Sequence, residues 1–238
     1  MGLPIIKHPT FDLTIPSTKQ TIKYRPFLVK EEKVLLLAQS SNNVNDMISA
    51  VKQIINNCIV EGDVNIDFLP SFDIEYIFLK LRINSVAPEV DLKFTDPETD
   101  KEHKVKVDLS EVNVQFVEGS SNIVDIGNGI SMVMKWPTYS DIGSIDFEKD
   151  AAAGTVEMIK ICTTQILSGE NQEQVDQFKD YTNEEVDEFI DSLPPESFTK
   201  FQKFFTDMPK LEHTIEYEVG KKKKTHTFSG IQDFFSFA

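Results

Sequence analysis

The sequence predicts an α+β protein, because apolar residues recur with a helical period in some stretches and with a strand period in others. Over residues 72–86 the steps are three and four residues, which is typical of a core helix. Over residues 90–94 and 105–109 apolar and charged residues alternate, as in strands with one solvated face. We expect a helical body with a β-hairpin or meander insertion at about 88–136, and a C-terminal β-hairpin followed by a short helix.

The helix predicted at 72–86 organises the chain. Its apolar stripe is formed by Phe72, Tyr76, Leu79 and Ile83. Ser71 is suited to cap its start, and Asp73 and Glu75 lie in the first turn, where carboxylates meet the positive end of the helix dipole. Lys80 and Arg82 lie toward the other end. The helix dipole and a solvated face account for these charges, so this segment indicates the fold but no catalytic or binding function.

Five segments follow from the changes in pattern along the chain. They are an extended N-terminal arm at 1–29, a helical part of the core at 30–87, a β-rich section at 88–137, a helical section with an acidic segment at 138–209, and a C-terminal hairpin with an aromatic tail at 210–238. The arm either packs on its own domain or reaches a neighbouring molecule. Further helices are expected at 31–39, 44–57, 151–167, 183–193 and 195–208. The glycines at 127 and 129 are interpreted as a tight turn and not as a phosphate-binding loop.

The C-terminal hairpin carries two of the four histidines. If residues 220–224 form its loop, Val219 faces Thr225. The two-residue period of a strand then places His213 and His226 on opposite faces, where they cannot share a metal. A change of one residue in loop length would reverse this placement.

Net charge argues against a nucleic-acid partner. The chain has a formal charge of −15, and residues 1–87 are balanced, so the excess of acids lies in the rest of the chain. A nucleic-acid binder needs a cationic face. The sequence has no run of eighteen apolar residues, so we expect no stable membrane insertion. No signal peptide is recognised at the N-terminus, and we therefore expect the chain in the cytoplasm, where it is made.

The sequence carries no recognised catalytic or metal-binding pattern. Cys58 and Cys162 each fall in an apolar helical pattern without a CxxC partner, which favours buried reduced thiols. None of the four histidines lies in an HExxH, Cys/His or GxSxG context. We therefore expect no enzyme activity, no cofactor and no metal.

The densest run of charge lies between residues 169 and 191, where nine acidic residues occur with one lysine. Such a run is either a solvated face or a docking surface for a basic partner. The sequence leaves both interpretations open.

Several motifs, in this order and spacing, resemble the baseplate hub protein family of T-even-type contractile-tailed bacteriophages (myoviruses). They are KYRPFLVKEEKVLLLAQ at 23–39, Cys58, LPSFDIEYIFLKLRINSV at 69–86, GISMVMKWP at 129–137, FQKFFTDMPKLEHTIEY at 201–217 and the closing FSGIQDFF. Many members of that family carry cysteine in the first hairpin, where this chain has Thr95, Asp96 and Pro97. A metal-stabilised hairpin is therefore not implied here.

The resemblance implies a non-enzymatic viral tail protein that acts in assembly of the baseplate hub through contacts with other hub and tail proteins. One alternative is a transient acidic assembly chaperone of hub subunits that is absent from the mature virion; a distant alternative is a cell-wall-degrading enzyme. The implied location is the host cytoplasm during assembly and, for a hub component, the tail baseplate of the virion. The oligomeric state is left open.

Aromatic residues, arginine and the acidic run are the candidate partner-binding groups, because aromatics and arginine concentrate binding energy at interfaces. The predicted partner-binding residues are Phe11, Tyr24, Arg25, Phe27, Glu184, Glu185, Phe204, Phe205, Phe234 and Phe235. About half of the aromatics are equally suited to the core.

Overall fold

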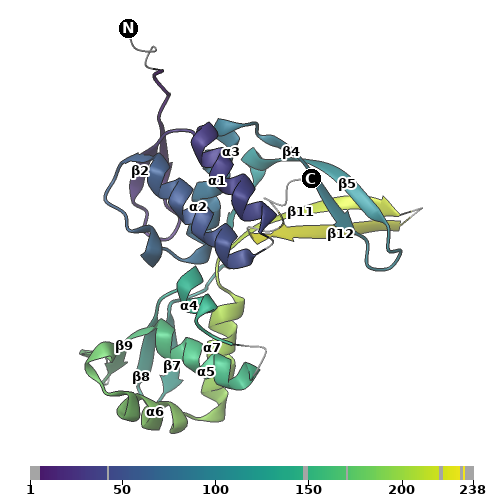
Figure 1. The fold of residues 1–238 in the computed structure, drawn as a ribbon. Coiled ribbons are helices and arrows are strands. Elements are labelled where there is room, and N and C mark those ends of the chain that lie inside the picture. Colours follow the sequence, from purple (N-terminus) through teal and green to yellow (C-terminus); the bar gives the residue numbers. More distant parts are fainter. Residues whose placement is uncertain are drawn as a thin grey trace. The chain divides into compact units, whose positions relative to one another are not determined.

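The computed structural model describes residues 6–41, 43–146, 150–169, 171–219, 222–230 and 233. The chain forms two compact units, shown in Figure 1. Unit 1 comprises residues 1–115 and 210–238, and unit 2 comprises residues 116–209. Helices and small antiparallel sheets occur in both, which confirms the α+β class. The section expected to be β-rich, 88–137, is divided between the units, because its first hairpin lies in unit 1 and residues 116–137 lie in unit 2.

The described residues of unit 1 form three helices and three small sheets. The helices are α1 (Val29–Ser40), α2 (Val44–Cys58) and α3 (Ser71–Ser85), with short 3-10 helices at Ile66–Phe68 and Leu109–Glu111. The sheets are β1 (Phe11–Thr14), β2 (Thr21–Tyr24) and β3 (Ile59–Glu61); β4 (Glu89–Thr95) and β5 (Glu102–Asp108); and β12 (Lys222–Ser229), β11 (Lys210–Val219) and β6 (Asn113–Gln115). β6 pairs with β11, so the two segments of unit 1 are joined in one sheet.

Helix α3 is the core helix that the sequence predicts, but its capping and its charges differ from the prediction. Pro70 is the N-cap residue, and Ser71 is the first helical residue and is buried. Asp73, Glu75 and Arg82, which were assigned to a solvated face, are buried as well. The helix is surrounded by other elements, so even its polar positions turn inward. Asp73 accepts hydrogen bonds from the backbone N–H (3.1 Å) and the hydroxyl of Ser17.

Residues 11–24 of the predicted N-terminal arm pack on unit 1. Strands β1 and β2 pair antiparallel, with Phe11 opposite Tyr24 and Leu13 opposite Ile22. On its other side β2 pairs antiparallel with β3. Leu13 and Ile22 are buried, as the alternation of apolar residues along both strands requires. Of the two interpretations of this segment, packing on its own domain is therefore the one that holds for residues 11–24.

The β4–β5 and β11–β12 hairpins lie side by side (Figure 1) and are joined by a buried carboxylate. Asp96, in the turn after β4, accepts hydrogen bonds from the Tyr217 hydroxyl (2.8 Å) and from the Lys224 ammonium (2.9 Å). The ammonium of Lys224, helped by Tyr217 and two backbone N–H groups, holds the pKa of Asp96 well below its usual range although burial would raise it.

The predicted placement of the two hairpin histidines is wrong. Val219 pairs with Lys222, so the connection is shorter than the five residues assumed. His213 consequently pairs with Phe228, and His226 pairs with Ile215, which puts both histidines on the same face. The His226 ring stacks on Phe94 at 4.1 Å between centroids.

Unit 2 is a four-stranded antiparallel sheet packed against helices. Its strand order is β10 (Gln174–Gln177), β9 (Thr163–Ser168), β8 (Ile130–Met134) and β7 (Ile123–Gly127). Its helices are α4 (Tyr139–Gly143), α5 (Ala151–Cys162), α6 (Asn183–Asp191) and α7 (Pro195–Thr206), with a 3-10 helix at Phe178–Asp180. The core includes Met132, Ile159 and Phe201. The predicted tight turn joins β7 to β8, with positive φ at Gly127, Asn128 and Gly129.

One predicted helix of unit 2 is too long. The expected helix at 151–167 ends at Cys162, and Thr163–Ser168 is strand β9, which pairs with both β8 and β10. The β-branched Thr163 and Thr164 favour a strand, and the sheet supplies partners that a helix would forgo.

Candidate interaction surfaces

The aromatic residues predicted at the N-terminal segment differ in exposure. Tyr24 is buried, and its hydroxyl accepts a hydrogen bond from Asn84 Nδ2 at 2.6 Å. Phe11 is half-buried, with its ring 5.8 Å from that of Tyr24. Phe27 is half-buried too, and its backbone N–H donates to Ser85 Oγ at 2.9 Å. Tyr24 therefore belongs to the core, while Phe11 and Phe27 each keep an accessible edge.

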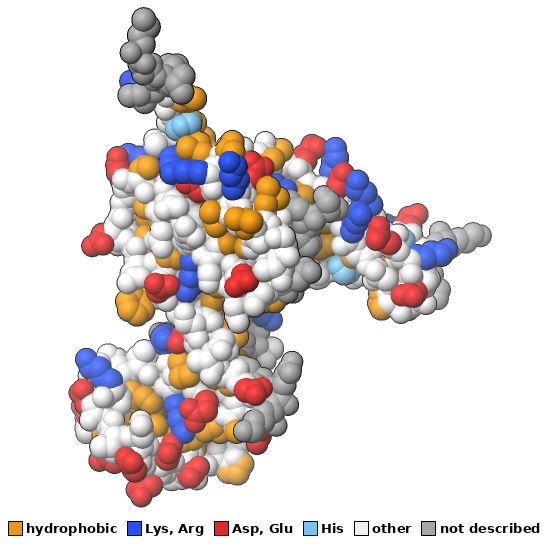
Figure 2. All heavy atoms as spheres, in the orientation of Figure 1, with side chains coloured by type: hydrophobic (Ala, Val, Ile, Leu, Met, Phe, Trp, Pro, Cys, Tyr) orange, Lys and Arg blue, Asp and Glu red, His pale blue; other side chains and the backbone are white. Residues whose placement is uncertain are grey.

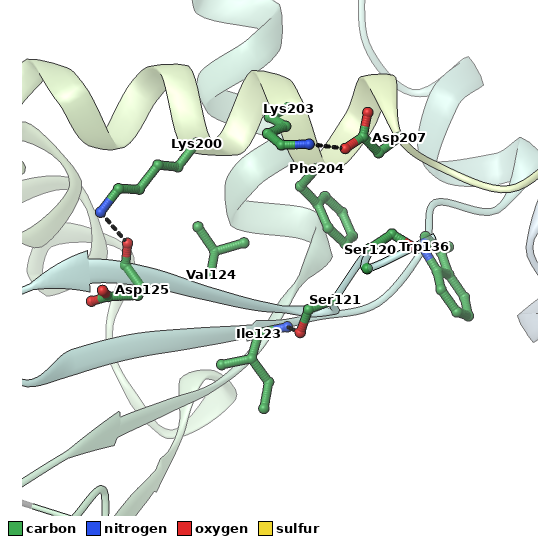
Figure 3. Close-up of a pocket in the computed structure, with 11 residues that line it drawn as sticks. Ser120, Ser121, Ile123, Val124, Asp125, Trp136, Lys200, Lys203, Phe204 and Asp207 are labelled. Carbon is green, nitrogen blue, oxygen red and sulfur yellow. Dashed lines mark hydrogen bonds and ion pairs between the residues drawn. The ribbon is translucent and has the colours of Figure 1, made fainter. Parts of the chain in front are cut away.

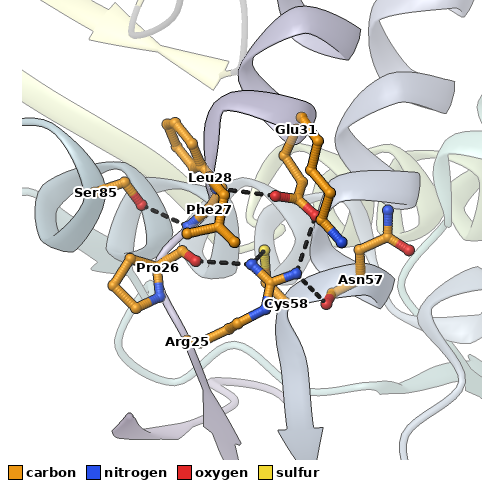
Figure 4. A network of polar contacts seen from close by, with 9 residues as sticks. Arg25, Pro26, Phe27, Leu28, Glu31, Asn57, Cys58 and Ser85 are labelled. Atoms are coloured by element: carbon orange, nitrogen blue, oxygen red, sulfur yellow. Dashed lines mark hydrogen bonds and ion pairs between the residues drawn. The ribbon is translucent and has the colours of Figure 1, made fainter. Parts of the chain in front are cut away.

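Arg25 is engaged inside unit 1, as Figure 4 shows. Its Nη2 donates to Glu31 Oε1 and to the Asn57 carbonyl oxygen, both at 2.9 Å. Its Nη1 donates to the Pro26 carbonyl oxygen at 2.9 Å and lies 3.6 Å from Cys58 Sγ. The guanidinium thereby joins the end of β2, the start of α1 and the end of α2. Five donors on a planar group suit this task, which a lysine could not perform.

Glu31 is the anionic partner in this network and is almost fully buried. Its second carboxylate oxygen accepts the Leu28 N–H at 2.9 Å and so caps α1. Burial alone would raise the pKa of Glu31, but the hydrogen bonds from Arg25 and Leu28 together hold that pKa below its ordinary value. Burial raises the pKa of the neighbouring Cys58 thiol to about 11, so this thiol is a poor nucleophile.

A surface that sequence reasoning missed lies on α1. This helix buries Glu31 and leaves Val29, Leu36 and Leu37 between 58% and 71% exposed. Val44, at the start of α2, is also exposed. We call these four residues the α1 face; Figure 2 shows apolar side chains over the region of unit 1 where α1 and α2 run in Figure 1. The signal was the unbroken apolar run VLLL at 34–37, which is too wide for one buried stripe.

The two predicted acidic residues lie in the first turn of α6, and both are exposed. Glu185 completes a capping box, because its carboxylate accepts the Thr182 N–H at 2.8 Å while Thr182 Oγ1 accepts the Glu185 N–H. The hydrogen bond from the Thr182 backbone lowers the pKa of Glu185. The Glu184 carboxylate makes no hydrogen bond or ion pair with any residue that the structure describes. Acidic side chains line the part of unit 2 where α6 runs (Figure 2).

Phe204 and Phe205 lie on α7 and face different surroundings. Phe204 is buried and borders a pocket of about 280 Å³, drawn in Figure 3, together with Trp136. Phe205 is half-buried and borders a second cavity with Met158 and Ile142. The rings of the two phenylalanines meet edge to face at 5.2 Å. Phe204 is therefore part of the core, and Phe205 is partly accessible.

The Figure 3 pocket has two lysines on its border, and both are engaged. Lys200 Nζ donates to the Asp125 carbonyl oxygen at 2.7 Å, and Lys203 pairs with Asp207 (Figure 3). No nucleophile lies beside a general base among the residues that line it. The pocket is bordered by two aromatic rings and by two lysines balanced by two aspartates, and its lining holds no arrangement for catalysis.

The remaining candidates add no chemistry. Phe234 and Phe235, and most of the expected closing helix, lie outside the described residues. Cys58 and Cys162 are buried free thiols in different units. Within the described ranges, no group of three or more His, Cys, Asp or Glu side chains could hold a metal ion. In the same part of the chain, no helix has the length and apolar character needed to cross a bilayer.

The chain was compared with known proteins. A family model described as T4 bacteriophage base plate protein matches residues 8–236, which is nearly the whole chain. No curated protein and no solved structure matches. The chain therefore belongs to the T4 bacteriophage base plate protein family, and this membership supports a structural or assembly role in the phage baseplate.

Proposed function

We propose that this chain acts in assembly of the hub at the centre of the baseplate, without catalysis, by binding other hub and tail proteins. Family membership supports the baseplate part of this proposal. The observation that carries the binding part is the α1 face, where a helix buries a glutamate and presents Val29, Leu36 and Leu37 to solvent. Exposed apolar side chains gathered on one helix and the start of the next mark a candidate protein interface.

The α1 face has the make-up of an interface centre. Its aliphatic side chains are flanked by the exposed Lys30 and Lys33, so an apolar contact with a polar rim is available. The Arg25–Glu31 network behind it fixes the start of α1, which keeps the surface rigid and lowers the entropic cost of binding. The half-buried Phe11 and Phe27 are proposed as neighbouring contacts.

The second candidate is a transient chaperone that shields hub subunits during assembly in the host cytoplasm and is absent from the mature virion. The charge of unit 2 favours it. Residues 116–209 contain 6 Lys or Arg and 18 Asp or Glu, a net charge of −12. A surface so acidic attracts basic partners at long range and releases them as salt or a competing partner screens it.

The experiment that separates the two candidates is quantitative mass spectrometry of purified tails, with capture of hub proteins from infected cells by the tagged chain. A fixed copy number in finished tails is expected for a hub component. Absence from tails together with capture of hub proteins would support the chaperone. Absence from tails and no capture of hub proteins would contradict both. Purified chain is expected to leave peptidoglycan intact, and cleavage would revive the enzyme alternative.

A further inference from the structure

Unit 2 has an apolar groove between its sheet and α6. The groove has a volume of about 470 Å³, within the range of ligand and peptide sites. Ile130 of β8, Ile166 of β9 and Phe178 form its floor, and Val186 and Phe189 of α6 form one wall. Ile130, Ile166 and Phe189 are only partly buried and pack directly on the core of unit 2. The floor is therefore supported from beneath and need not rearrange to accept a side chain.

Carboxylates stand on the border of this apolar floor. Glu185 and Glu188, one turn of α6 apart, both line the groove. Glu185 is held in place by its capping box with Thr182. The Glu188 carboxylate makes no hydrogen bond or ion pair with any residue that the structure describes. A fixed anion and an unpaired one thus lie beside an apolar floor.

This combination selects the occupant. An apolar floor accepts an aliphatic or aromatic side chain, and the two carboxylates favour lysine or arginine on either side of it. The net charge of −12 on unit 2 adds long-range attraction for the same chemistry. A second copy joined symmetrically through this groove would bring two acidic borders together, because a two-fold interface pairs one surface with the same surface of the other copy. Like charges there disfavour a dimer.

We propose that the groove between α6 and the β8–β9 sheet binds a basic amphipathic segment of a partner protein, with an apolar side chain anchored on Ile166 and flanking cations at Glu185 and Glu188. The inference rests on the proposed function only for the partner being a tail protein. The proposal assigns part of the acidic run at residues 169–191, Glu185 and Glu188, to a binding site for a basic amphipathic segment.

The test measures binding of the full-length chain to a fluorescent helical peptide made of lysine and leucine. A matched peptide made of lysine and serine keeps the charge and removes the apolar anchor. We expect the leucine peptide to bind at least about tenfold more tightly than the serine peptide, since a buried aliphatic anchor carries more than the exposed ion pairs do. Equal binding of the two peptides would overturn the proposal, as would no binding of either.

Four variants locate the site. Glu188→Gln is expected to weaken the leucine peptide about threefold, whereas Glu184→Gln, the same change of charge on the same helix outside the groove, should change it less than twofold. Ile166→Ser should weaken it about tenfold, and Val175→Ser, at an exposed position of the neighbouring strand, should have no effect. Thermal unfolding locates the midpoint of each variant; because Ile166 packs on the core of unit 2, Ile166→Ser is expected to lower its midpoint, and binding is measured well below that midpoint, where the fold is intact. If Glu184→Gln weakened binding as much as Glu188→Gln, the attraction would be diffuse. If Val175→Ser weakened it as much as Ile166→Ser, the apolar anchor would not lie in the groove. Either result would overturn the groove as the binding site.

The same variants separate this inference from the proposed function. Hub assembly can be scored independently in phage that depend on the plasmid-borne chain. If Glu188→Gln and Ile166→Ser support assembly while peptide binding behaves as expected, the groove binds the stated chemistry and hub assembly does not use it. If peptide binding fails while assembly requires the chain, the groove is overturned and the proposed function stands.

Discussion

The two units of this protein handle charge in opposite ways. Unit 1 has 18 Lys or Arg and 21 Asp or Glu, a net charge of −3, and places several of these groups inside, as in the Arg25–Glu31 and Lys224–Asp96 pairs. Unit 2, with a net charge of −12, keeps most of its carboxylates on the surface. Buried pairs fix the geometry of a fold, whereas exposed carboxylates act on partners through space.

The units also differ in how the chain builds them. Unit 2 is one continuous stretch with its own core around Met132 and Phe201. Unit 1 is discontinuous and closes only when β11 pairs with β6, with Leu211 opposite Val114. Because long-range pairing carries a loop-closure cost, we expect unit 2 to form first and unit 1 to depend on contacts far apart in sequence.

The largest effect is expected from removing a central ring of unit 1. Phe78→Ala empties a fully buried position on α3 and should lower the free energy of unfolding by about 3–5 kcal/mol. Trp136, the only tryptophan, lies in unit 2 and reports on that unit alone. Far-UV circular dichroism should therefore show an early transition while tryptophan fluorescence keeps its original midpoint. Equal shifts of both signals would mean that the units unfold as one; Phe68→Ala, at a position 79% exposed, is the control.

Next in size is the loss of the buried ion pair. Arg25→Met leaves the buried Glu31 carboxylate with only the exposed Lys30 as its cation and should cost about 2–3 kcal/mol in denaturant unfolding. Since the folded pKa of Glu31 is lowered, its contribution is present above the ordinary carboxyl pKa and is lost as pH falls below it. The variant should therefore be penalised most near neutral pH. Lys23→Met breaks the more exposed ion pair with Glu61 and should leave the free energy of unfolding unchanged. A loss of stability equal to that of Arg25→Met would contradict the difference claimed between the buried and the exposed ion pair.

A smaller effect is predicted for Asp73. Burial raises the pKa of this carboxyl to about 6, although hydrogen bonds from Ser17 oppose the rise. A raised folded pKa adds stability as pH falls through 6 toward the unfolded value near 3.8, because the folded state then binds the extra proton. Unit 1 should gain about 1 kcal/mol between pH 7 and 5. Asp73→Asn should abolish that gain, and an identical pH profile in the variant would refute the assignment.

The smallest effect on stability, and the clearest on association, is expected from the surface of α6. Replacing Glu184, Glu185, Asp187 and Glu188 by the corresponding amides should leave the unfolding midpoint nearly unchanged, since glutamine preserves the capping box at Glu185. Binding of a basic partner should become slower and less sensitive to salt. A native complex whose association ignores salt would show that unit 2 does not steer its partners.

Sequence reasoning succeeded where the pattern was local. The helix expected at 44–57 is α2 (Val44–Cys58), because one apolar stripe and an Asn43 cap agree. It failed where tertiary contacts decide. Helix α3 is covered over most of its surface, so Asp73 and Arg82 could not be assigned to a face from periodicity. Strand β9 was read as helix because its apolar spacing fits both periods and only its partners in the sheet settle the choice.

The interaction surfaces were predictable only in part. Exposed acids on α6 follow from composition, but burial of Tyr24 and Phe204 depends on which elements pack over them. Arg25 was predicted to bind a partner protein. Its partners within the chain, Glu31 and the Asn57 carbonyl, come together only in the fold, so the sequence could not show that its guanidinium is engaged. The α1 face had a sequence signal in its excess of leucine, whereas the α6 groove had none, since its floor is contributed by two strands and a 3-10 helix.

The most direct test of the central claim is genetic complementation. A phage from which this gene is deleted would be supplied with the wild-type chain, with Leu36→Asp/Leu37→Asp, or with the control Phe68→Asp, and assembled baseplates would be counted by electron microscopy. We predict baseplates with wild type and control, and few or none with the α1-face variant although it stays folded. Normal baseplates in the absence of the chain would contradict a role in assembly, and full rescue by the double variant would contradict the α1 face as its binding surface.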